Sequence, residues 1–252
     1  MKNTDQSTLL FGLELFGSTK TRLLAEIDSR VKSQKLPILI ATPNPEQVML
    51  SRRDSVFLDH LQSFDLQIPD GNGLVWASKL LAKKTDQPKL TQRITGVWLT
   101  KELLKKAERS KKQVLIVGGR RYKYHVSNYL RLSWSVGYEN VNHPKEEEEK
   151  ALEALILELK PVYVFVAFGA PAQEAWIISH RALLEKAGVK VAMTVGGAFD
   201  MLFGITPRAP GWIRALQLEW LYRLIQEPTR WRRQLQLIEF VKLTFKALLK
   251  IQ

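Results

Sequence analysis

Short apolar runs alternate with longer amphipathic stretches along most of this 252-residue chain. The alternation is typical of a parallel sheet covered by helices, because a strand buried on both faces is continuously apolar, whereas a covering helix is apolar on one side only. We expect strands at residues 38–41, 65–68, 113–117, 162–168 and 190–195. We expect helices at residues 18–33, 45–62 with a break, 74–83, 97–109, 144–159 and 172–186. The predicted fold is α/β and Rossmann-like, with a mainly parallel sheet, flanking helices and a C-terminal helical appendage.

The C-terminal fifth differs in composition from the rest of the chain. Residues 205–252 hold nine basic and three acidic residues, which is +6 of the total formal charge of +13. After Pro207 and Pro210 the pattern predicts a helix over residues 212–226, a break at Pro228 and a second helix to about residue 250. We therefore divide the chain into an α/β core, residues 1–204, and a basic helical appendage, residues 205–252.

The last predicted helix is amphipathic and basic. Its apolar face carries Ile238, Val241, Phe245 and Leu248, and its lysines lie on another face. Such a helix is suited to an anionic membrane surface. A helix docked on the core with its lysines in water explains the pattern equally well, and the sequence leaves both interpretations open.

The net charge of +13 predicts an anionic partner, which is nucleic acid, an acidic lipid surface or a phosphorylated substrate. The chain has no cysteine, so disulfides, thiolate nucleophiles and cysteine-bound zinc are excluded. Glu14 interrupts an early apolar run, so a signal peptide is not expected. The weakly polar stretch 161–172 is shorter than the roughly 20 residues that a membrane-spanning helix needs. We expect a soluble or peripheral protein, and the absence of cysteine suits a reducing cytoplasm.

Side chains that bind metals are scattered. The four histidines, His60, His125, His143 and His180, lack metal-ligand spacing and are expected at the surface. The acidic run 146–149 is expected to be the solvated first turn of its helix, where negative charge suits the helix dipole. No Asp-x-Asp pair occurs, which removes the commonest holder of a divalent ion on a sugar nucleotide. Arginines and backbone N–H groups would then have to stabilise the negative charge of a diphosphate.

Small and polar residues follow each of the five predicted strands. They are residues 42–45, 69–73, 118–119, 169–174 and 196–197 with Asp200. The carboxyl ends of parallel strands meet at one edge of a sheet, where open α/β sheets bind their ligands. We therefore expect these clusters to form one site.

Each cluster also has a purely structural explanation. Asn44, followed by Pro45 and by Gln47 at the third helical position, is typical of a helix N-cap with a capping box. Asp70 is either a turn residue before Gly71 or a general base that takes a hydroxyl proton, and the local sequence alone favours the turn.

Two glycine pairs follow predicted strands. Gly118 and Gly119 let backbone N–H groups approach a phosphate, but they fall short of G-x-G-x-x-G and support a dinucleotide site only weakly. Gly196 and Gly197 permit tight packing or a positive φ.

Motifs at defined spacing run through most of the chain. They begin with Thr42-x-Asn44-x-Glu46, Arg53-Asp54, Pro69-Asp70-Gly71-x-Gly73 and Arg93-Ile94-Thr95-Gly96. They continue with Gly169-x-Pro171-x-Gln173-Glu174-x-Trp176 and Gly196-Gly197-x-Phe199-Asp200. They close with Arg208-Ala209-Pro210-x-Trp212, Leu218-Glu219-Trp220-Leu221-Tyr222-Arg223 and Glu227-Pro228-x-Arg230, and these last blocks are highly specific. With these motifs the sequence resembles the WecG/TagA/CpsF family of bacterial glycosyltransferases, which make cell-surface polymers.

The resemblance implies transfer of a sugar, typically of N-acetylmannosamine type, from a UDP donor to a polyprenyl-diphosphate-linked sugar. It implies a peripheral enzyme on the inner face of the cytoplasmic membrane, which inverts the anomeric carbon without a metal or another cofactor. Nucleic acid is not expected as a partner. The oligomeric state, a homo-oligomer included, stays open.

The resemblance also implies roles for single residues. Asp70 corresponds to the base that deprotonates the acceptor hydroxyl, and Thr42 and Asn44 would line the acceptor pocket beside it. Arg93 and Gln173 would hold donor or acceptor. The leaving UDP would lie against backbone N–H groups of the glycine pairs 118–119 and 196–197. The C-terminal segment would close over the active site at the membrane and bring four arginines to the diphosphates: Arg208, Arg214, Arg223 and Arg230.

Two positions depart from the family pattern. Ala172 stands where the family commonly has lysine, and residues 120–123 stand where many members have Pro-Gly. Both concern the donor, so the donor sugar is left open. Two other functions remain as alternatives: a nucleic-acid-binding protein, for which no recognised motif is present, and a Rossmann-type NAD-dependent oxidoreductase, which the poor glycine fingerprint opposes.

Overall fold

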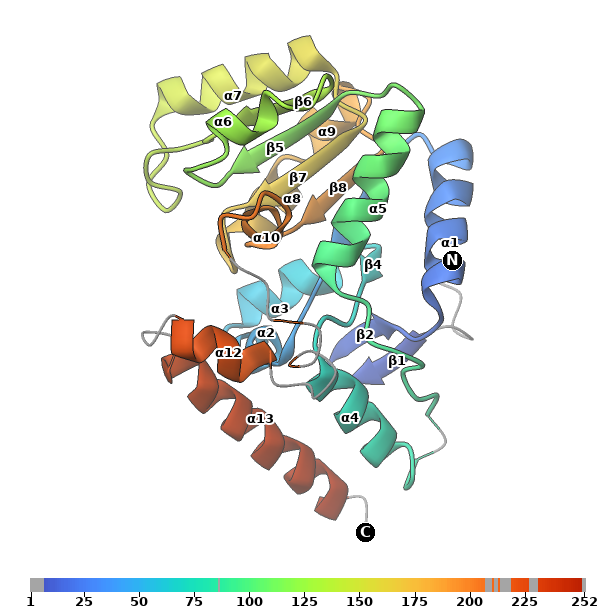
Figure 1. Cartoon of the computed structure of the whole chain (residues 1–252). Helices are drawn as coiled ribbons and strands as arrows, with labels where there is room; N and C mark the ends of the chain where they lie inside the picture. The colour runs from blue at the N-terminus through green and yellow to red at the C-terminus, as the bar shows by residue number, and fades with distance from the viewer. Residues whose placement is uncertain are drawn as a thin grey trace.

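A computed structural model of the chain describes residues 7–85, 87–206, 210, 213, 219–226 and 231–250. One eight-stranded sheet runs through it, with helices on both faces (Figure 1). The strands are β1 (Ser7–Leu10), β2 (Leu13–Phe16), β3 (Ile38–Ala41), β4 (Leu66–Gln67), β5 (Val114–Gly118), β6 (Leu132–Ser135), β7 (Tyr163–Ala167) and β8 (Val191–Thr194). Their order in the sheet is β1-β2-β4-β3-β8-β7-β5-β6, and every pair except β1–β2 is parallel.

Two layers of helices cover the sheet. On one face lie α1 (Lys20–Ser33), α5 (Gly96–Arg109), α6 (Lys123–Val126) and α10 (Ala198–Leu202). On the other lie α2 (Pro45–Ser51), α3 (Ser55–Gln62), α4 (Asn72–Leu81), α7 (Glu146–Leu159), α8 (Ala172–Ser179), α9 (Arg181–Lys186) and α13 (Trp231–Lys250). The segment before α13 contains α12 (Glu219–Gln226).

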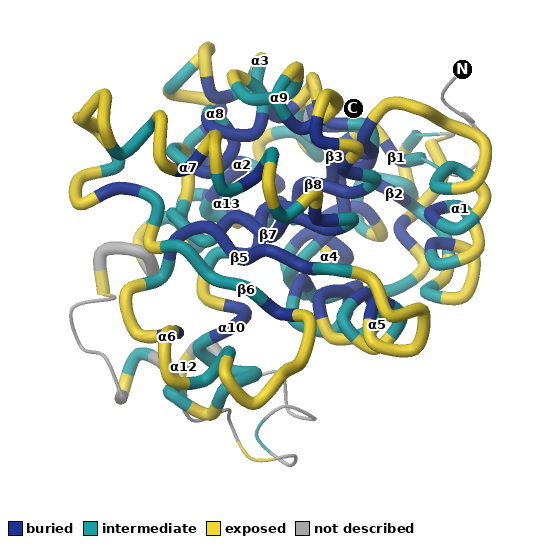
Figure 2. The backbone as a smooth tube through the Cα atoms, turned by 90° about the horizontal axis from the view of Figure 1, so that it is seen from above, coloured by how far each residue is buried: buried dark blue, intermediate teal, exposed yellow. Residues whose placement is uncertain are grey.

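Strand side chains alternate between the two layers. In β3, Leu39 and Ala41 join the core under α2 and α8, whereas Ile38 and Ile40 join the core under α1 and α5. The central strands are almost entirely buried between these layers (Figure 2). The α/β fold, the mainly parallel sheet and its flanking helices are therefore confirmed.

Polar caps explain where several helices begin. The Asn44 side chain accepts from the N–H of Gln47, and the Gln47 side chain accepts from the N–H of Asn44, which is the predicted capping box of α2. The break expected within residues 45–62 lies between α2 and α3, where Asp54 caps the new helix by accepting from the N–H of Phe57.

Three strands were not predicted. β1 and β2 form a hairpin through Phe11 and Gly12, both at positive φ, and pair Leu9 with Glu14 across the ladder. Glu14, which interrupts the apolar run in sequence, is therefore the outward residue of a strand and accepts from the Ser7 hydroxyl. In β6 only Leu132 is buried, because this strand lies at the edge of the sheet.

The helix α13 docks on the core beside α2 and α4 (Figure 1). Its buried side chains are Phe240 and Thr244, and the Phe240 ring meets Phe11 edge-on at 5.6 Å between centroids. Glu239 forms an ion pair with Arg53, which follows α2. Ile238, Val241 and Phe245 of the predicted apolar face are exposed, although Phe245 also meets Trp76 of α4, so the buried contact comes from residues that the prediction did not place on that face. No helix among the described residues is long and apolar enough to cross a bilayer.

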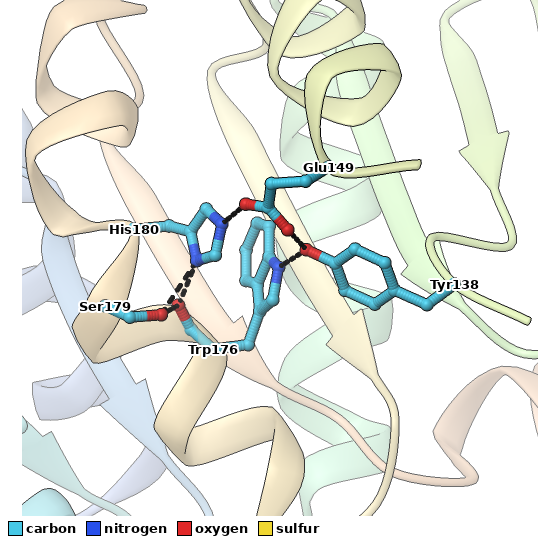
Figure 3. A network of polar contacts seen from close by, with 5 residues as sticks. All are labelled: Tyr138, Glu149, Trp176, Ser179 and His180. Carbon is cyan, nitrogen blue, oxygen red and sulfur yellow. Dashed lines mark hydrogen bonds and ion pairs between the residues drawn. The ribbon is translucent and has the colours of Figure 1, made fainter. Parts of the chain in front are cut away.

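The acidic run 146–149 forms the first turn of α7 as predicted, but Glu149 and His180 depart from the expected solvent exposure. His180 is mostly buried and pairs with Glu149, whose other oxygen accepts from the Tyr138 hydroxyl (Figure 3). The Trp176 indole stacks on His180 and donates to the same hydroxyl at 2.7 Å. Glu149 is therefore not merely solvated in the first turn of α7, because it joins α7 to α8 and to the loop after β6.

Candidate active site

A cleft of about 1370 Å³ opens at the carboxyl edge of the sheet. Residues after β3, β4, β5, β7 and β8 line it, together with residues of α13. β3 lies where the chain order of the sheet reverses, with β4 on one side and β8 on the other. The predicted convergence of the five strand-end clusters is thus what the structure shows.

The carboxylate of Asp70 lies in this cleft and is 27% exposed. Its Oδ2 accepts from the N–H of Gly96 at 3.0 Å, and its Oδ1 lies 3.5 Å from a guanidinium nitrogen of Arg93. Gly96 is the first residue of α5, where N–H groups have no partner within the helix and the helix dipole is positive. Asp70 is therefore oriented by a helix N-terminus and a cation while still facing the cleft.

The backbone of Gly96 lies close to both Thr42 and Asp70. A Cβ there would lie 3.2 Å from Thr42 Oγ1 and 3.5 Å from Asp70 Oδ2. The Thr42 hydroxyl donates to the Thr194 carbonyl at 3.3 Å, which ties β3 to the end of β8. The structure thus brings together Thr42, Asp70 and Arg93, three of the predicted site residues.

Asn44 and Gln173 also line the cleft, and a buried carboxylate connects them. Gln47, the capping partner of Asn44, donates from Nε2 to Oε1 of Glu174 at 3.1 Å. Gln173 donates from Nε2 to the same oxygen at 2.9 Å. Glu174 itself is fully buried, and this burial raises its pKa to about 7.

The glycine pairs are placed differently from each other. Gly119 lines the cleft, while a Cβ on Gly118 would lie 2.9 Å from the backbone of Ala167 in the neighbouring strand. Gly196 and Gly197 both line the cleft, but the N–H of Gly196 already donates to Gln173 Oε1 at 3.1 Å. Close strand packing therefore accounts for Gly118, and a diphosphate would have to compete with Gln173 for the Gly196 N–H.

Two cations that follow β5 also lie at the cleft, in the segment 120–123 that the sequence connects with the donor. Arg120 and Arg121 line the cleft, and Arg120 also donates to the Glu139 carbonyl at 2.8 Å. Tyr122 is buried behind them among Phe199 and Phe203. The sequence signal for these arginines is their place directly after a strand-end glycine pair, where they add positive charge.

The helix α13 closes one side of the cleft with Ile238, Phe240 and Val241. Trp76 of α4 also lines the cleft and meets the Phe245 ring edge-on at 5.9 Å. The predicted diphosphate ligands Arg208, Arg214 and Arg230 lie outside the described residues, as does the side chain of Arg223. Within the described part of the chain, no group of three or more His, Asp or Glu residues is arranged to hold a metal ion.

Comparison with known proteins gives a consistent result. A family model described as "Glycosyl transferase WecG/TagA/CpsF family" matches residues 8–252. A protein of Bacillus subtilis is 31% identical over 96% of this chain and 92% of its own length. A protein of Bacillus spizizenii is 33% identical over 93% and 89%, and one of Staphylococcus aureus is 30% identical over 89% and 85%. All three are named N-acetylglucosaminyldiphosphoundecaprenol N-acetyl-beta-D-mannosaminyltransferase.

Proposed function

Because the chain belongs to the WecG/TagA/CpsF family of glycosyltransferases, we propose that it transfers N-acetylmannosamine from UDP to N-acetylglucosamine on a polyprenyl diphosphate. The names of the relatives support the acceptor and the transferred sugar. UDP as the carrier, inversion and independence of metal are part of the proposal. The family membership favours this function over nucleic-acid binding and over NAD-dependent oxidation.

The placement of Asp70 is the observation that carries the mechanism. A carboxylate beside an open cleft, oriented by the Gly96 N–H and by Arg93, is suited to accept a proton from a bound hydroxyl. In the proposed step the acceptor hydroxyl passes its proton to Asp70 while its oxygen attacks the anomeric carbon. The bond from that carbon to the diphosphate oxygen breaks, and UDP leaves with the electron pair. One displacement of this kind inverts the anomeric carbon.

The cleft offers separate surroundings for the two substrates. We assign Thr42, Asn44 and Asp70 to the acceptor, together with the apolar residues of α13 and Trp76 that also line the cleft. Arg120 and Arg121 are cations on the side of β5, where they suit the diphosphate of the donor. We include membrane attachment in the proposal, because the exposed apolar residues and lysines of α13 suit an anionic bilayer next to a lipid-linked acceptor.

The test is a product assay with purified protein. UDP-N-acetylmannosamine, UDP-N-acetylglucosamine and UDP-glucose are each offered with N-acetylglucosamine on a polyprenyl diphosphate, with and without EDTA. Mass spectrometry is expected to find one added N-acetylhexosamine from the first donor, unaffected by EDTA, and NMR is expected to find an inverted anomeric carbon. Transfer from another donor would refute the sugar assignment, a requirement for metal would refute the metal-independent step, and no transfer from any donor would refute the function.

A further inference from the structure

Glu174 in α8 is a buried carboxyl that the proposed reaction does not use. Its Oε1 accepts from two glutamine side chains, Gln47 and Gln173. Its Oε2 is buried, and no residue in the described part of the chain offers it a hydrogen bond. Burying a carboxyl of which only one oxygen accepts hydrogen bonds lowers the stability of the fold, so its presence calls for a reason beyond packing.

The carboxyl oxygen determines which way the two amides point. An amide has an acceptor end and a donor end, and only the donor end can bind Oε1. Gln47 therefore turns its own oxygen to the N–H of Asn44, at 3.1 Å. Gln173 turns its oxygen to the N–H groups of Gly169 and Gly196, at 3.3 and 3.1 Å.

These contacts join three strand ends that border the cleft. Asn44 follows β3, Gly169 follows β7, and Gly196 follows β8. We propose that Glu174 is a positioning residue, which fixes the Gln47 and Gln173 amides and through them holds Asn44, Gly169 and Gly196 around the bound substrates. The inference rests on the proposed function, because it assigns these residues to the pockets of that reaction.

Two substitutions separate positioning from simple filling of space. Glu174→Gln keeps one oxygen that accepts from both amides, so kcat/KM is expected to stay within about threefold of the wild type. Glu174→Leu fills a similar volume without a hydrogen-bond acceptor, so it is expected to lower kcat/KM at least about tenfold at pH 7. Of the two substitutions, only Glu174→Gln is expected to keep the activity. If Glu174→Leu does not fold, Glu174→Met replaces it, because the flexible methionine fits the same space with less strain.

Glu149 provides the matched control. It is also a carboxylate that joins two side chains, Tyr138 and His180, but it stands in the network of Figure 3 and not on the cleft. Glu149→Leu is expected to lower the melting temperature while leaving kcat/KM per folded molecule unchanged. An equal loss of kcat/KM in Glu149→Leu and Glu174→Leu would overturn the positioning role.

A double-mutant cycle tests whether Glu174 acts through Gln173. The combined loss in the variant with Gln173→Ala and Glu174→Leu is expected to be smaller than the product of the two single losses, since both remove the same contact. Independent, multiplying losses would contradict the proposal.

Side-chain NMR gives a readout that needs no activity. The amide NH2 signals of Gln47 and Gln173, identified by their loss in Gln47→Ala and Gln173→Ala, are expected to exchange slowly with water in the wild type and in Glu174→Gln. In Glu174→Leu they are expected to exchange fast. Slow amide exchange in a wild-type protein that transfers no sugar would support the hydrogen-bond network and refute the proposed function. Fast amide exchange in an active wild type would refute the network alone.

Discussion

At the scale of the residue, the proposed chemistry depends on one carboxylate. The sequence around Asp70 favours a plain turn, and only the resemblance to a family makes it a base. The structure adds a physical reason, because the Gly96 N–H and Arg93 orient the carboxylate from two sides at the cleft. These partners stand 26 and 23 positions further along the chain, so no local pattern around Asp70 predicts them.

Asp70→Asn is expected to lower turnover at least about a hundredfold, the usual minimum for loss of a general base. The asparagine oxygen still accepts from the Gly96 N–H, so the fold and substrate binding are expected to stay. Initial rates and circular dichroism check both statements. Asp59→Asn, on an exposed position of α3, is the control that should behave as wild type. Near-normal transfer by Asp70→Asn would refute the base.

Because the Glu174 carboxyl is buried, we expect the free energy of unfolding to depend on pH. Its pKa is raised by burial to about 7 in the folded chain, well above its value in an unfolded chain. Below both values the carboxyl is neutral in either state and the fold keeps its full stability. As pH rises toward 7 the unfolded state ionises first, so the free energy of unfolding falls, by about 3–4 kcal/mol in total, and then levels off.

Urea unfolding of wild type and Glu174→Gln between pH 5 and pH 8 measures this effect. The stability of the wild type relative to the variant should decline up to about pH 7 and stay constant above it. A difference that does not change with pH would show that the carboxyl keeps an ordinary pKa.

At the scale of the element, the long strands and helices follow from their hydrophobic patterns, whereas the short ones do not. α6 has four residues and α10 has five, too few for a helical period to show. β6 takes its place from pairing with β5 in register, which involves residues 18 positions apart, such as Val114 and Leu132. Such elements are set by the neighbours that tertiary structure supplies.

The two faces of α13 are expected to have different roles, one in packing on the core and one in membrane binding. Phe240 is 1% exposed and Phe245 is 48% exposed, on one helix. Phe240→Ala is expected to cost about 3–5 kcal/mol of unfolding free energy, the usual cost of a large core truncation. Phe245→Ala is expected to cost about 1 kcal/mol or less but to weaken sedimentation with phosphatidylglycerol vesicles. Equal stability losses would contradict the docked helix, and unchanged sedimentation would contradict the membrane face.

At the scale of the whole molecule, the position of the cleft could be predicted from the sequence, whereas the buried hydrogen bonds behind it could not. Parallel strands place their carboxyl ends at one edge, so five clusters in the sequence indicate one site. The bond from Gln47 to Glu174 joins residues 127 positions apart, and nothing in either local sequence indicates it. The division at residue 204 stays a prediction, although Phe240 belongs to the same hydrophobic cluster as the core.

Deleting residues 205–252 tests that division. The truncated protein is expected to lose transfer and vesicle binding, because α13 forms one side of the cleft and carries the proposed membrane face. It is also expected to melt at a lower temperature, since the surfaces of α2 and α4 under Phe240 become exposed. The product assay, vesicle sedimentation and thermal unfolding measure these losses. An active truncation would show that the appendage is dispensable.

The network around Glu174 also limits how the gene of this chain can be recombined with genes of its relatives. Gln47 and Glu174 lie on α2 and α8, and the chain between them includes β4 to β7. A crossover between these positions takes the two partners from different parents, and a mismatch turns an amide the wrong way at the centre of the protein. In laboratory shuffling, residues 44–47 and 169–196 are therefore best inherited together from a single parent.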